Sequence, residues 1–133
     1  MKHNLTLRIT SVLSILLTTL HLTSDALRAR AGTPEAGGST LVAVPVLVVW
    51  LYGTLFLPER RSGRIIMLIG AILAMVMPVV HVTGAAGVFQ GVLAKGSGDF
   101  VFVWTLHALG VTGMFSFILA ARALFNLPPG QPQ

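Results

Sequence analysis

Four long apolar segments dominate the sequence and limit what it can fold into. They cover about residues 5–26, 40–57, 64–83 and 100–125, and each is close to the roughly 20 residues that a helix needs to cross a hydrocarbon core. A backbone surrounded by lipid has to satisfy its own hydrogen bonds, so these segments are expected to be helices. The sequence therefore predicts an all-α integral membrane protein, a four-transmembrane-helix bundle forming a single membrane domain over residues 1–133.

Composition supports a membrane protein. Only 10% of the 133 residues are charged, whereas a soluble domain usually carries about 25%. Polar and Gly-rich residues are concentrated in the predicted loops 27–39 and 84–99 and in the tail 126–133, which is expected to be disordered. Cysteine is absent, which excludes disulfides, thiolate metal sites and cysteine nucleophiles.

The basic residues predict an orientation in the membrane. Cytoplasmic ends of membrane helices are enriched in Lys and Arg, and six basic residues fall on one side of the four-helix topology: Lys2, Arg8, Arg60, Arg61, Arg64 and Arg122. Both termini are therefore predicted to be cytoplasmic, and loops 27–39 and 84–99 to face outward, in an inner or plasma membrane. The net charge of +5 is explained by these helix-end residues, so no nucleic-acid partner is expected.

The first segment also has features of a signal peptide. Lys2 precedes the apolar run, and Ala29-Arg30-Ala31 has the form of a cleavage site. The length of the apolar run and the arginines before the possible cut favour a retained helix.

Three histidines lie one each in the first, third and fourth segments, and all three fall in the outer half of the predicted topology. Each belongs to a stripe with helical spacing, and polar and small residues tend to avoid lipid, so we expect the three stripes to face one another. The stripes are Ser11, Ser14, Thr18, His21 and Asp25; Gly70, Ala74, Met77, His81 and Gly84; and Val103, His107, Gly110, Met114 and Phe117. Trp50 and Trp104 lie away from the predicted helix ends, so both are expected to pack inside the bundle.

Imidazoles and a carboxylate are suitable ligands for a transition metal ion. The set His21, Asp25, His81 and His107 predicts a site for zinc, copper or iron. Alternatively, Asp25 could accept a hydrogen bond from the N–H of a metal-binding imidazole without binding the metal itself. A b-type haem between His81 and His107, or between His21 and either, is a second cofactor hypothesis. The sequence assigns no catalytic residue.

These observations leave three functional hypotheses open. The first is a membrane protein that binds a metal ion or haem near the outer face, for metal handling or electron transfer. The second is a non-enzymatic accessory or assembly subunit of a larger membrane complex, in which the histidines pack or serve a partner. The third is a small oligomeric transporter, for example a homo-oligomer, or a proton-linked channel, in which protons would pass through Asp25 and the histidines.

Overall fold

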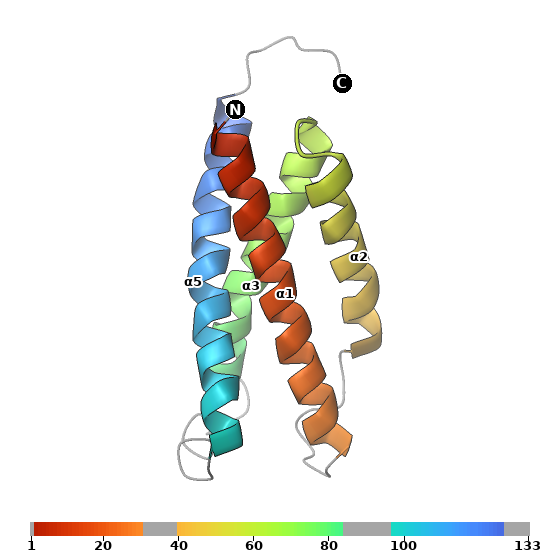
Figure 1. Ribbon diagram of the computed structural model, residues 1–133, viewed down its shortest axis with the longest axis vertical. Coiled ribbons are helices and arrows are strands. Elements are labelled where there is room, and N and C mark those ends of the chain that lie inside the picture. The colour runs from red at the N-terminus through yellow and green to blue at the C-terminus, as the bar shows by residue number, and fades with distance from the viewer. Residues whose placement is uncertain (1, 31–39, 84–96, 127–133) are drawn as a thin grey trace.

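A computed structural model describes residues 2–30, 40–83 and 97–126, and within these ranges all regular secondary structure is helical. The helices are α1 (Lys2–Arg30), α2 (Thr40–Phe56), α3 (Arg61–Thr83) and α5 (Ser97–Phe125). They run alternately up and down, so that α1 begins and α5 ends at the same end of the bundle (Figure 1). The predicted all-helical fold is confirmed.

Helices α1, α3 and α5 pack together, and α2 packs against α1 and α3 at the side of this group (Figure 1). The helices α1, α3 and α5 are long and apolar enough to cross a membrane. Helix α2 is also apolar but has 17 residues, which span about 25 Å at 1.5 Å per residue. Length and composition therefore support three of the four predicted membrane spans, those of α1, α3 and α5. Helix α2 is apolar but shorter than the other three.

The outer surface of the bundle is apolar over much of its length. Exposed valines, leucines and aromatic residues include Val42, Val48, Leu51 and Phe56 on α2 alone. Hydroxyl groups on this surface are satisfied within their own helix. For example, the exposed Thr23 donates to the carbonyl oxygen of Thr19 at 2.8 Å. A surface of this kind is suited to lipid and would be a liability in water.

Small residues line the contact between α3 and α5. A Cβ atom at Gly113 would lie 2.9 Å from the Cβ of Ala74, 3.0 Å from the backbone nitrogen of Met75 and 3.2 Å from the carbonyl oxygen of Ala71. Two of these atoms belong to the α3 backbone and cannot move aside. Small residues therefore let the two helices approach as they commonly do in membrane bundles.

The two tryptophans have different environments. Trp50 is 2% exposed, and its indole lies against Gly70 of α3, where a Cβ atom would collide with the ring. Trp104 is 61% exposed and lies edge-to-face with Phe100 on the outside of α5. The prediction of internal packing is confirmed for Trp50 and wrong for Trp104.

The helix boundaries differ from the predicted ones mainly at the ends. Helix α1 extends beyond residues 5–26 on both sides, α3 begins at Arg61, and α5 begins at Ser97 within the predicted loop 84–99. A β-turn joins α2 to α3, with Pro58 at its second position and the amide of Arg60 donating to Leu57 at 3.1 Å. Residues 31–39, 84–96 and 127–133, which hold most of the predicted loops and tail, lie outside the described residues.

We expect Gly113→Leu to separate α3 from α5 and destabilise the bundle by about 1–3 kcal/mol, as overpacking usually does. Thermal unfolding in detergent, followed by circular dichroism, measures the effect. The matched control is Val111→Leu, because Val111 lies on the same helix and is 53% exposed. Equal unfolding temperatures for the two variants would contradict this account of the contact.

Candidate functional site

The polar stripe of α1 lies inside the bundle. Ser11, Ser14 and His21 have no exposed surface, and Thr18 is 8% exposed. The inward orientation predicted for these four residues is confirmed. Asp25 lies in α1 one turn after His21, but its side chain is outside the described part of the structure.

Ser11 is the centre of a closed hydrogen-bond network with α2. The indole Nε1–H of Trp50 donates to Ser11 Oγ at 2.8 Å, and Thr54 Oγ1 donates to the carbonyl oxygen of Trp50 at 2.8 Å. Because the Thr54 proton is thus used, the 2.8 Å contact between Ser11 Oγ and Thr54 Oγ1 has Ser11 as its donor. Every hydroxyl and indole proton in this buried network has an acceptor, which fixes α2 against α1.

The next residue of the stripe, Ser14, contacts α5. Ser14 Oγ donates to the carbonyl oxygen of Thr10 at 3.0 Å and lies 3.4 Å from Ser116 Oγ of α5. Thr18 Oγ1 donates to the carbonyl oxygen of Ser14 at 2.7 Å. The contact with Ser116 is longer than those at Ser11, so it is the weaker of the two polar links from α1.

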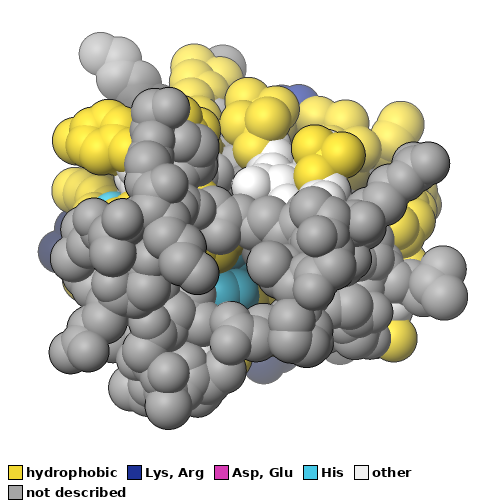
Figure 2. Space-filling view, turned by 90° about the horizontal axis from the view of Figure 1, so that it is seen from below, with side chains coloured by type: hydrophobic (Ala, Val, Ile, Leu, Met, Phe, Trp, Pro, Cys, Tyr) yellow, Lys and Arg dark blue, Asp and Glu magenta, His cyan; other side chains and the backbone are white. Residues whose placement is uncertain are grey.

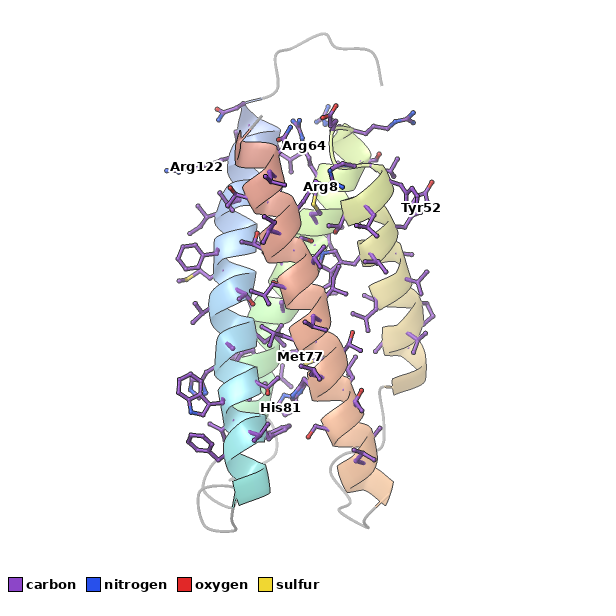
Figure 3. All side chains as sticks on the ribbon, viewed as in Figure 1. Arg8, Tyr52, Arg64, Met77, His81 and Arg122 are labelled. Atoms are coloured by element: carbon purple, nitrogen blue, oxygen red, sulfur yellow. The ribbon has the colours of Figure 1, made fainter. Side chains whose placement is uncertain are left out.

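At the far end of the stripe, His21 meets His81 of α3. Their ring centroids are 4.6 Å apart and their planes are nearly perpendicular, at 79°. Phe102 of α5 lies 5.0 Å from His21 and 5.8 Å from His81, centroid to centroid. Figure 3 labels His81 in this region, and Figure 2 views the bundle from that end, where histidine side chains are visible. Three helices therefore enclose a pair of imidazoles, which we call the histidine pair.

The tautomer of His81 follows from its hydrogen bond. His81 Nδ1 lies 2.9 Å from the carbonyl oxygen of Met77. A carbonyl oxygen only accepts, so Nδ1 carries the proton and, in the neutral ring, Nε2 carries the lone pair. A backbone carbonyl that holds one ring nitrogen of a histidine commonly accompanies metal binding by the other.

The structure does not bring His107 to the histidine pair. Its side chain is exposed on α5, and its Nδ1 donates to the carbonyl oxygen of Val103 at 2.8 Å. The inward stripe predicted for this helix is therefore wrong, since Met114 is exposed as well.

The buried face of α5 is displaced by one residue from the predicted one. It consists of Phe102, Leu106, Leu109, Gly113, Ser116 and Ala120. One residue is a rotation of about 100° around a helix, which is enough to move His107 to the outside. The signal that would have identified this face is the small-residue series Gly113, Ser116 and Ala120, which fits the close contact with α3.

The geometry of the histidine pair fits one ion better than a haem. Two imidazoles on a tetrahedral ion, with metal–nitrogen distances near 2.0–2.1 Å, have ring centroids about 5 Å apart. The observed 4.6 Å is within a small side-chain adjustment of that value. Axial ligands on opposite faces of a haem would lie about 6 Å apart with the porphyrin between them, so this pair does not fit a haem. Among the described residues, no three His, Asp or Glu side chains converge on one point.

Comparison with known proteins gives no relative to guide the assignment: no protein-family model matches the chain, and no significant match was found among curated proteins or solved structures.

The network around Ser11 predicts that two serine-to-alanine substitutions on the same stripe lower the stability of the bundle by different amounts. Ser11→Ala leaves the Trp50 indole N–H without its acceptor and should destabilise the bundle by about 1–3 kcal/mol. Ser14→Ala, the matched control on the same stripe, loses a longer contact and should cost less. Thermal unfolding of both variants, alone and combined with Trp50→Phe, measures the coupling. If Ser11→Ala and Trp50→Phe prove additive, the proposed link between α1 and α2 is wrong.

Proposed function

We propose that the protein binds a transition metal ion, zinc, copper or iron, through His21 and His81, and that its role is metal handling in the membrane. The observation that carries this proposal is the contact of two imidazoles from different helices at a separation suited to one ion. Imidazole is a good ligand for each of these metals. The absence of cysteine makes histidine nitrogen the main ligand type in this chain.

The surroundings of the pair support metal binding. His21 is fully buried, and polar side chains inside a membrane are costly and usually serve a function. The hydrogen bond from His81 to Met77 presents Nε2 of His81 as the ligating nitrogen. Asp25 is the candidate third ligand, because a residue four positions after His21 lies on the same helix face.

The proposed topology has four spans, both termini in the cytoplasm and the histidine pair toward the outer side. It is supported by the end-to-end separation of the two groups of side chains, since Arg8, Arg64 and Arg122 lie at one end of the bundle and His81 toward the other (Figure 3). A metal ion at the histidine pair would then be reached from outside the cytoplasm. Electron transfer through a haem is less well supported, because the pair does not fit haem ligation.

Metal binding predicts that purified protein takes up about one ion per chain, measured by elemental analysis after equilibration with Zn(II), Cu(I) or Fe(II). His21→Leu and His81→Leu should lose the ion. His107→Leu, the matched control on the exposed face of α5, should retain it. At 100 times the dissociation constant, the ion should stabilise the wild type by about 2.7 kcal/mol, and this gain should disappear in His81→Leu.

A wild-type protein that takes up none of the three ions, and is stabilised by none, would overturn the proposal. The histidine pair would then be a packing contact, as expected for an accessory subunit, and co-purification with a larger complex would support that role. Flux into liposomes that Asp25→Asn abolishes would instead support a transporter.

A further inference from the structure

A group of charged side chains lies at the opposite end of the bundle from the histidine pair. Figure 3 places the labelled Arg8, Arg64 and Arg122 there, at the start of α1, the start of α3 and the end of α5. The α2–α3 turn and the first residue of α3 add two more, so that the arginine end consists of Arg8, Arg60, Arg61, Arg64 and Arg122.

The positive charge at the arginine end is not neutralised within the described part of the chain. Glu59 is the only carboxylate in the neighbouring turn, and its side chain is exposed. The described residues show no ion pair between Glu59 and any of the five arginines. An anion from outside the protein would therefore meet a strong positive potential here.

The depth of these arginines indicates what kind of anion this is. Three apolar spans cover Asn4–Ser24, Arg61–His81 and Phe100–Phe125, so Arg8, Arg64 and Arg122 each lie about one turn inside a span. Tyr52 and Phe56 stack at the same end of α2, with centroids 5.3 Å apart, and aromatic residues are enriched at the membrane–water boundary. In a bilayer crossed by these three helices, the arginines would lie near the level of the lipid phosphates.

Arg64 is held in place with one of its donors unused. Its Nη1 donates to the carbonyl oxygen of Ala123 in the last turn of α5 at 2.9 Å. Its Nε is buried and has no acceptor among the described residues. A buried donor without an acceptor is unfavourable, and a guanidinium presents further donors in a fixed fork that matches phosphate.

Arg8 supplies a second guanidinium from a different helix. It is half-buried on α1, next to Leu7 of the core cluster and one turn before Ser11. Arginines from neighbouring helices at this depth are a common arrangement for recognising acidic lipid headgroups.

We propose that the arginine end binds the headgroup phosphate of an anionic phospholipid, with Arg8 and Arg64 as the contacting pair and Arg60 and Arg61 as peripheral charges. An anionic lipid is favoured over a zwitterionic one, because the latter would bring its own ammonium group to an uncompensated cluster of arginines. It is favoured over free phosphate because half-buried side chains inside an apolar span are reached from the bilayer.

The test is a titration of delipidated protein in detergent with phosphatidylglycerol or phosphatidylcholine, followed by native mass spectrometry. We expect phosphatidylglycerol to bind about 10- to 30-fold more tightly, the preference that two arginines at a membrane surface would give. Arg8→Gln combined with Arg64→Gln should reduce this preference to less than threefold. Arg60→Gln combined with Arg61→Gln is the matched control, since it removes the same charge and should keep most of the preference.

Arg8→Gln alone leaves the Arg64–Ala123 hydrogen bond intact. It should lower the preference for phosphatidylglycerol over phosphatidylcholine at least threefold. The helical circular dichroism spectrum should stay unchanged. Equal losses from the two double variants would overturn the assignment to Arg8 and Arg64. Equal affinities of the wild type for the two lipids would overturn the site altogether. Displacement of phosphatidylglycerol by millimolar inorganic phosphate would show that free phosphate is the ligand and would overturn the assignment to lipid.

Discussion

The buried polar stripe of α1 is the constraint on which the rest of the bundle depends. Serine, threonine and histidine side chains recur along one face of a helix whose other faces carry exposed leucine and isoleucine. Lipid cannot satisfy these groups, so neighbouring helices have to cover them. Ser11 is hydrogen-bonded to α2, and Ser14 to α5. The ring of His21 packs against rings of α3 and α5. The stripe thus sets the position of all three other helices.

The same arrangement separates two kinds of chemistry along the bundle axis. Arginines gather where α1 begins, and the histidine pair lies beyond the hydroxyl groups toward the other end (Figure 3). The middle of the bundle is closed by hydrogen-bonded hydroxyls and by the small-residue contact between α3 and α5. The two proposed sites thus lie toward opposite ends of the bundle.

Much of the candidate site could be predicted from residue spacing, because a helix with one polar stripe has only one face that can be buried. The prediction that Ser11, Ser14, Thr18 and His21 face inward is confirmed. The same reasoning failed for α5, where a stripe through His107 and a stripe through Gly113 and Ser116 compete. The polarity of His107 favoured the stripe through His107. The close approach of the α3 backbone requires the stripe through Gly113 and Ser116. The hydrogen bond from His107 to Val103 lets an imidazole remain on the outer face, because its own helix supplies an acceptor.

The sequence by itself determined the helical architecture, the inward face of α1 and the distribution of charge between the two ends. These properties follow from segment length, the period of the helix and the cost of polar groups in lipid, all of which are local. Only the tertiary structure decided that His21 meets His81 and that His107 does not join them. It also decided that Trp50 completes a hydrogen-bond network rather than merely filling space. These outcomes depend on how far each helix rotates about its axis, and that rotation is set by packing between side chains distant in the sequence.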